Sequence, residues 1–362
     1  MIPDRAATLT EAARLRDLFE AAGALPVETT ILQPAEALLD LYGEDIRARA
    51  YVTSDALRGE QMLRPDFTVP VVQMHMRHGT EPARYTYSGE VFRRQEEDPA
   101  RANEYIQVGY EIFERDAPEA ADAEVFSKLF NILKPLGLRA ATGDIGILMA
   151  AVDGLHTTER RKAALRRHIW RPRRFRALTD RFSGRTPIPE ARAALLSAED
   201  PMAGSGPLVG LRGEDEIQNR INALRDDAAT PPIARAEVDL LDAMLAVRET
   251  SDNALERLRD IAVDMAAIRP AVTRLARRLE ALEARGIDTR QLEFEASYGR
   301  VQMEYYDGFV FGFHAEKRPD LPPVATGGRY DALTRQLGAG HQSAAVGGVI
   351  RPGLVLALGG GV

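Results

Sequence analysis

Residues 104–113, EYIQVGYEIF, have the clearest β-strand pattern in the chain. Side chains alternate between the two faces of a strand. One face is apolar and holds Ile106, Val108, Tyr110 and Ile112, whereas the other holds Gln107, Gly109 and Glu111. Two polar side chains that flank a glycine on one face predict the floor of a pocket. The spacing alone is equally consistent with ordinary polarity on a solvent-facing side of a sheet.

Further strands and helices are predicted on both sides of this strand. Strands are expected over 27–33, where Pro34 ends the run, and over 84–93. Helices are expected over 35–42, 69–77, 122–138 and, as one long helical region, 190–285. Near the C-terminus we expect strands 298–306 and 309–314 to form a hairpin around Asp307-Gly308. A glycine-rich loop at 326–331 is expected to open a helix. A strand followed by a helix is expected over 343–358. The patterns predict an α+β fold in which strands before about residue 150 and after about 290 share one antiparallel sheet.

Composition excludes several classes of protein. The chain has 362 residues and no cysteine, which rules out disulfide scaffolds, thiolate zinc sites and a cysteine nucleophile. Its start has no apolar signal segment and no stretch is apolar enough to cross a bilayer, so we expect a cytoplasmic protein without a membrane partner. His75 and His78 have no third ligand nearby, and no nucleotide-binding glycine motif occurs, so neither a metal nor a cofactor is expected.

Two candidate binding groups lie close to the strand at 104–113 in sequence. Asp66, in the loop Leu63-Arg64-Pro65-Asp66-Phe67-Thr68, could hold an ammonium group through charge-assisted hydrogen bonds. Arg93 ends the strand at 84–93, where an arginine suits a phosphate, although a solvated strand end is the commoner explanation.

A basic segment covers residues 156–185. It contains eleven lysines and arginines but only two acids, Glu159 and Asp180, and its net charge of +9 leaves −16 for the rest of a chain that totals −7. The segment could contact RNA, phosphate or an acidic partner surface. A solvated helix face is the more common reason for such a run.

Several motifs together resemble the catalytic domain of histidyl-tRNA synthetase, a class II aminoacyl-tRNA synthetase. Residues 27–34 look like motif 1, and residues 84–93 with 107–113 look like motif 2. Residues 63–68 are similar to the family's Leu-Arg-Pro-Glu-Gly-Thr. The segments EYYDG (304–308) and TGGRYD (326–331) resemble the two histidine-specific signatures, and AVGG (345–348) opens a segment like motif 3. The resemblance implies an antiparallel sheet flanked by helices in segments 1–165 and 289–362, with a mostly helical insertion at 166–288.

Departures from the synthetase pattern argue against catalysis. Val301 occupies the place of the family's catalytic arginine, and Arg300 is one residue away, which in a strand would point it to the opposite face. Gln95 replaces the motif 2 glutamate, and Arg351-Pro352-Gly353-Leu354 replaces the Gly-Leu-Glu-Arg of motif 3. Because the sequence ends at Val362, shortly after the segment like motif 3, we expect no anticodon-binding domain. Lost groups of this kind often reduce a rate by about 10²–10³ each.

A synthetase-like chain that loses these groups but keeps a histidine pocket resembles the ATP phosphoribosyltransferase regulatory subunits of histidine biosynthesis. The resemblance implies a non-catalytic subunit that activates the short-form ATP phosphoribosyltransferase catalytic subunit, mediates feedback inhibition by L-histidine, forms a dimer and does not bind tRNA. The histidine-binding residues that it implies are Asp66, Thr68, Arg93, Gln107, Glu111, Tyr305, Tyr306, Gly328 and Tyr330. The alternatives are a truncated histidyl-tRNA synthetase or related amino-acid-activating ligase, and an RNA-binding module.

Overall fold

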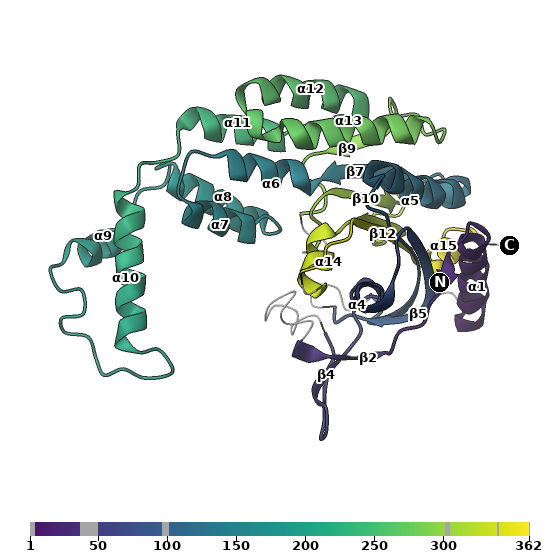
Figure 1. Ribbon diagram of the computed structural model, residues 1–362, viewed down its shortest axis with the longest axis horizontal. Helices are drawn as coiled ribbons and strands as arrows, with labels where there is room; N and C mark the ends of the chain where they lie inside the picture. The colour runs from purple at the N-terminus through teal and green to yellow at the C-terminus, as the bar shows by residue number, and fades with distance from the viewer. Residues whose placement is uncertain (1–3, 37–49, 96–100, 301–304, 339, 362) are drawn as a thin grey trace.

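A nine-stranded sheet forms the centre of the protein in the computed structural model, which describes residues 4–36, 50–95, 101–300, 305–338 and 340–361 (Figure 1). The strand order is β1-β5-β6-β12-β11-β10-β7-β9-β8. The strands are β1 (Leu25–Pro26), β5 (Ala83–Phe92), β6 (Glu104–Phe113), β7 (Arg139–Asp144), β8 (Arg248–Thr250), β9 (Glu293–Glu295), β10 (Phe309–His314), β11 (Ala325–Arg329) and β12 (Ala345–Ile350). Strands from both ends of the sequence therefore share one sheet, as predicted. All neighbours are antiparallel except β1–β5 and β7–β9.

The predicted alternation of β6 is confirmed. On its apolar face, the Tyr110 ring stacks on Phe19 of α1 (Arg5–Ala21), and the Tyr110 hydroxyl donates to Glu124 of α5 (Pro118–Leu133) at 2.6 Å. The opposite face carries Gln107 and Glu111, both almost fully buried, and faces the beginning of α4 (Thr68–His78). Both faces of β6 are thus covered, so the polar side chains do not face solvent.

The predicted strand at 27–33 is wrong as one element. Residues 25–26 form β1 beside β5, and β2 (Leu32–Pro34) belongs to a second sheet of order β2-β4-β3. The other members of that sheet are β3 (Val52–Asp55) and β4 (Gly59–Leu63). The chain leaves one sheet and enters another within this apolar run, a change that residue composition does not signal. Most of the helix predicted at 35–42 lies outside the described residues.

The predicted hairpin around Asp307 is also wrong. Tyr298 and Arg300 lie in turns, residues 301–304 lie outside the described part, and β10 pairs with β7 and β11 instead. The Asp307 carboxylate accepts backbone N–H groups of Asp331 and Ala332 at 2.9 and 2.6 Å, at the start of α14 (Asp331–Leu337). An Asp-Gly pair that predicts a turn therefore serves to cap a distant helix. Of the loop predicted at 326–331, residues 326–329 instead belong to β11, whereas the helix predicted to follow is confirmed as α14.

The middle of the chain is mostly helical. Its helices are α6 (Ile145–Gly154), α7 (Glu159–Arg167), α8 (Pro172–Phe182), α9 (Glu190–Ser197), α10 (Glu214–Ala229), α11 (Arg235–Leu245), α12 (Ser251–Asp264) and α13 (Arg269–Glu283). The short strand β8 interrupts the predicted helical region and pairs with β9 of the central sheet. We call α9, α10 and their connection, residues 190–229, the arm; it projects from the other helices (Figure 1). In the arm α9 buries no residue and α10 buries only Ile221.

Strand β12 leads into the last helix, α15 (Pro352–Ala357), as predicted for residues 343–358. Within the described ranges, no helix is both long enough and apolar enough to span a membrane.

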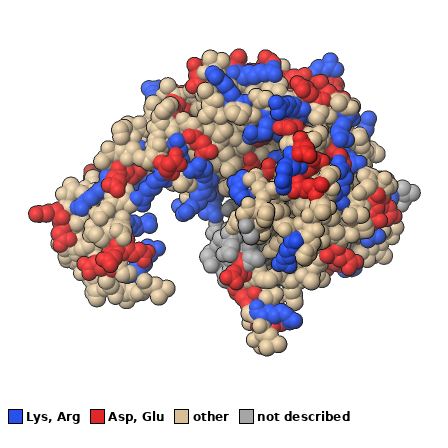
Figure 2. Space-filling model, in the orientation of Figure 1, with Lys and Arg blue, Asp and Glu red and all other residues tan. Residues whose placement is uncertain are grey.

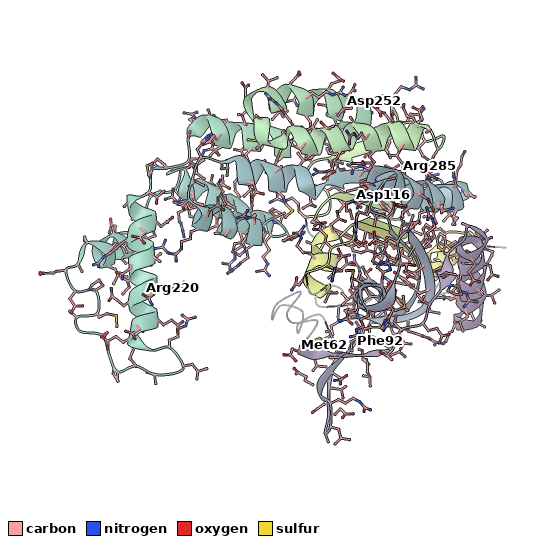
Figure 3. All side chains as sticks on the ribbon, viewed as in Figure 1. Met62, Phe92, Asp116, Arg220, Asp252 and Arg285 are labelled. Atoms are coloured by element: carbon pink, nitrogen blue, oxygen red, sulfur yellow. The ribbon has the colours of Figure 1, made fainter. Side chains whose placement is uncertain are left out.

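A buried ionic network links five elements of the fold. Arg278 of α13 lies 3.2 Å from Asp122 of α5 and 2.5 Å from Asp144 at the end of β7. Arg329 of β11 donates to the same Asp122 at 2.7 and 3.0 Å and to Asp331 at 3.0 Å. Asp122 therefore bridges two buried guanidinium groups, each of which has a further carboxylate partner. Just after α13, Arg285 lies 3.5 Å from Glu124, so a more exposed ion pair also joins α13 to α5 (Figure 3).

Candidate functional site

One pocket collects most of the predicted binding residues. It is lined by Asp66, Thr68, Arg93, Gln107, Glu111, Tyr305, Tyr306, Thr326, Tyr330, Gly347, Gly348 and Val349. It lies between the start of α4 and the face of the sheet made by β6, β11 and β12. Eight of the nine predicted side chains are thus brought together from segments that are far apart in the sequence.

Glu111 is the most enclosed acid of the pocket. Its carboxylate accepts hydroxyl hydrogen bonds from Tyr87 at 2.7 Å, Tyr330 at 2.6 Å and, more weakly, Thr68 at 3.2 Å. Burial raises the pKa of Glu111 to about 7, because the three hydroxyl donors only partly offset the loss of solvation and nearby Asp66 adds repulsion. Glu111 therefore changes charge near neutral pH. In its ionised form, the Glu111 carboxylate can accept a hydrogen bond from an N–H group of a ligand or bind a positively charged group.

The glycines on neighbouring strands make room for this carboxylate. Gly347 of β12 is the register partner of Glu111, and a Cβ at Gly347 would lie 1.4 Å from Glu111 Oε2. A Cβ at Gly109 would lie 2.0 Å from the Tyr87 ring. Only glycine leaves space at these two positions for the Glu111–Tyr87 pair.

Gln107 presents an acceptor that has no donor. The residue is 1 % exposed, and within the described part of the chain no donor reaches its Oε1 atom. Buried polar atoms are almost always hydrogen-bonded, to protein or to a bound molecule. Because Gln107 lines the pocket two residues before Glu111 on the same strand face, this atom is suited to receive an N–H from a ligand.

The loop 63–68 is held in place by two arginines. Arg93 Nε donates to the carbonyl oxygen of Pro65 at 2.7 Å, and Arg64 Nε donates to the carbonyl oxygen of Glu90 at 2.7 Å. The loop positions Asp66, which is 3 % exposed and accepts a 3.4 Å hydrogen bond from Val69 N–H in the first turn of α4. The pocket therefore contains a second buried carboxyl group besides Glu111.

Aromatic rings form another wall. The Tyr305 ring makes edge contacts with the rings of Tyr306 and Tyr330, at centroid distances of 4.8 and 6.1 Å. Gly328 does not line the pocket; a Cβ there would lie 2.7 Å from the Tyr306 ring, so this glycine lets Tyr306 pack against β11. Its contribution to the pocket is indirect, through the position of Tyr306.

The pocket is enclosed and narrow. Its free volume is about 20 Å³, enough for about one water molecule. A ligand larger than a water molecule would therefore need neighbouring side chains to move as it enters.

Several pocket residues were not predicted as binding residues. Thr326, Gly347, Gly348 and Val349 line the pocket, and Tyr87 supports it through Glu111. The glycine pair at 347–348 in an otherwise apolar strand signals a close approach of neighbouring atoms, which could have identified β12 as a pocket wall. Tyr87 gives no comparable signal, because its role depends on its register partner Gly109.

Arg300, Gln95 and Arg351, which stand at or beside departures from the synthetase pattern, are not among the residues that line the pocket. Arg300 is 5 % exposed; its Nε donates to the Ile169 carbonyl oxygen at 2.8 Å, and its guanidinium lies 4.8 Å from the Phe175 ring centre, so it packs against α8 and the turn that precedes it. Val301 lies outside the described residues. The Gln95 side chain donates to the carbonyl oxygens of Arg93 and Ala102, and the Arg351 guanidinium lies 4.9 Å from the centre of the Tyr105 ring.

Comparison with known proteins agrees with this architecture. The family model described as histidyl-tRNA synthetase matches residues 1–205 and 215–352. A solved structure from Bacillus halodurans, described as an ATP phosphoribosyltransferase regulatory subunit/histidyl-tRNA synthetase, superposes with a TM-score of 0.67 at 20% identity, covering 98% of this chain and 79% of that one. A histidine–tRNA ligase subunit from Alicyclobacillus acidocaldarius gives 0.61 at 23% identity, covering 98% and 94%. The fold is therefore that of the class II histidyl-tRNA synthetases.

Relatives found by sequence similarity indicate which family of this class the chain belongs to. ATP phosphoribosyltransferase regulatory subunits from Brucella anthropi and Brucella canis are 32% and 31% identical to this chain. The alignments cover 89% of both chains for the first, and 86% of this chain and 87% of the relative for the second. The chain belongs to the family of ATP phosphoribosyltransferase regulatory subunits within the histidyl-tRNA synthetase fold.

Proposed function

We propose that this chain binds L-histidine in the pocket and acts as a non-catalytic subunit that activates a short-form ATP phosphoribosyltransferase and makes it sensitive to histidine. The observation that carries the proposal is the buried set of acceptors in the pocket: Gln107 Oε1 without a donor, Glu111 and Asp66. An ammonium group and an imidazole N–H are donors that fit such a set.

The acceptors can be given separate roles. Asp66, at the edge formed by loop 63–68, would hold the ammonium group through a charge-assisted hydrogen bond. Gln107, Glu111 and Tyr306 would then position the imidazole and the carboxylate. Because ionised Glu111 only accepts hydrogen bonds, it would contact an N–H rather than the ligand carboxylate.

A regulatory role, rather than amino-acid activation, agrees with the placement of the cations. Adenylate formation needs cations at the developing phosphate charge. Arg300 instead packs against α8 and the turn that precedes it, and Val301, at the place of the family's catalytic arginine, carries no charge. Histidine bound here would change the activity of the partner only if it bound one state of the assembly more tightly than another.

Reconstitution of the complex tests the proposal. The phosphoribosyltransferase rate of the short-form catalytic subunit is measured alone, with this chain, and with this chain plus L-histidine. We expect activation by the chain and inhibition by histidine, with the inhibition weakened at least tenfold in Asp66→Ala and unchanged in Asp116→Ala, an exposed acid outside the pocket (Figure 3). Absence of activation would refute the regulatory role. Histidine-dependent exchange of pyrophosphate into ATP by the chain alone would instead support the ligase alternative.

A further inference from the structure

The lysines and arginines on and next to helices α7 and α8 fall into two sets, which differ in whether they form ion pairs within the chain. In one set, each cation has an acidic partner within the chain. Arg161 and Arg181 contact Asp227 of the arm, and Arg176 contacts Asp242 of α11. The remaining members of this set are Lys162 and Arg166 of α7 and Arg185 just after α8, which pair with acids on α6, α7, α8 and α11. These pairs attach α7 and α8 to the neighbouring helices.

Four exposed arginines form the second set: Arg160, Arg167, Arg173 and Arg174. None of these four makes an ion pair with any residue in the described ranges. We call this set the arginine face.

The four arginines lie on a short stretch of surface. Arg160 and Arg167 are seven residues apart on α7, which places them on one side of that helix. Arg173 and Arg174 follow after a four-residue turn, in the first turn of α8, where the helix dipole adds positive potential. Figure 2 shows lysine and arginine side chains gathered over this part of the molecule, beside the hollow that separates it from the arm.

We infer that the arginine face is a docking surface for an acidic surface of a partner protein, the catalytic subunit of the complex proposed above, on which this inference rests. A guanidinium forms paired hydrogen bonds with a carboxylate and keeps its charge at every physiological pH. The acids that contact α7 and α8 already pair with the other cations of this region, so the arginine face is complementary to acids supplied by a partner.

A protein partner fits the surrounding charges better than RNA does. The chain outside residues 156–185 has a net charge of −16, and α10, on the far side of the hollow, begins with Glu214, Asp215 and Glu216. An extended polyanion would pass from the arginine face into regions of the same sign as its own charge. A folded partner can present a few carboxylates to the arginine face and no charge beyond it.

Charge reversal tests the docking surface in the intact complex. The affinity of full-length Arg167→Glu/Arg174→Glu for the short-form catalytic subunit is measured by surface plasmon resonance at 50 and 500 mM NaCl. We expect binding at 50 mM NaCl to weaken at least tenfold, mainly through slower association, and to lose most of its dependence on salt. The matched control Arg77→Glu/Arg277→Glu reverses two exposed arginines on α4 and α13 that make no ion pair within the described residues, and should bind within twofold of the native chain.

The outcomes separate this inference from the proposed function. If the native chain forms no complex, the proposed function fails and the docking surface fails with it. If the native chain binds and the α7–α8 variant binds equally well, only the docking surface is refuted. If the variant loses binding to bulk tRNA but keeps its affinity for the catalytic subunit, the face binds RNA and the inference is wrong. Unchanged thermal unfolding of both variants shows that an affinity loss does not come from misfolding.

Discussion

At the scale of single residues, Glu111 is the group on which the pocket depends. It is buried, it holds three hydroxyl donors, and its raised pKa means that the folded protein binds its proton more tightly than the unfolded chain does. For an acid whose pKa is raised on folding, the free energy of unfolding falls as pH rises between the unfolded and folded values, here from about 4.5 to about 7.

Glu111→Gln should remove this pH dependence. Glutamine resembles the neutral acid and does not ionise. The variant therefore does not lose free energy of unfolding when the pH rises, whereas the native chain must ionise a buried carboxyl group. Between pH 5.5 and pH 8 we expect the free energy of unfolding of Glu111→Gln to rise by about 2 kcal/mol relative to the native chain. Urea unfolding of both proteins at the two pH values measures this difference in the free energy of unfolding. A difference that stays constant with pH would show that Glu111 titrates in its ordinary range.

Gly347→Ala should damage the pocket from the opposite strand. The added methyl group would displace the Glu111 carboxylate from Tyr330 and Thr68, because it cannot share the same space. We expect a loss of about 1–3 kcal/mol in the free energy of unfolding and at least tenfold weaker histidine binding. Gly206→Ala, where a Cβ meets no atom within 4 Å, is the control and should change neither quantity. A Gly347→Ala chain with native affinity would contradict the described packing.

At the scale of elements, local sequence patterns predicted some strands well and others poorly. Strand β6 was predicted at its observed bounds because its alternation is complete and both of its faces are covered. The hairpin predicted around residues 307–308 and the loop predicted at 326–331 were wrong because aspartate and glycine occur in turns, in helix caps and at close contacts between strands. Which use applies depends on partners far away in the sequence, such as Asp331 for Asp307.

The ionic network around Asp122 should be a major link between elements. Asp122→Ala leaves Arg278 with one carboxylate and Arg329 with Asp331 alone, both in buried surroundings. We expect the free energy of unfolding to fall by about 3–5 kcal/mol, as for other broken buried ion pairs. Asp122→Asn should lose less, since it keeps an acceptor. Glu256→Ala, which breaks an exposed pair with Arg259, should cost less than about 1 kcal/mol. Equal losses for Asp122→Ala and Glu256→Ala in urea unfolding would contradict this account.

At the scale of the whole molecule, sequence reasoning found most of the pocket but not how it is closed. Gln107 and Glu111 follow from strand alternation, and the loop with Asp66 and the tyrosines follows from the resemblance to the synthetase motifs. The contributions of Tyr87, Thr326 and Gly347 depend on which strands become neighbours, and the order β6-β12-β11 is a property of the sheet and not of any one segment. The arginine face likewise becomes visible only when the pairing of every other cation on α7 and α8 is known.

Calorimetric titration with L-histidine tests the central claim most directly. It is carried out on the native chain, on Asp66→Ala and on a mixture with the short-form catalytic subunit. The account predicts binding to the native chain alone, at one site per chain, weakened at least tenfold by Asp66→Ala because a charge-assisted hydrogen bond is lost. Absence of binding to the chain alone, or an affinity that Asp66→Ala leaves unchanged, would contradict it, and binding that occurs only in the mixture would place the histidine site on the partner or at the interface.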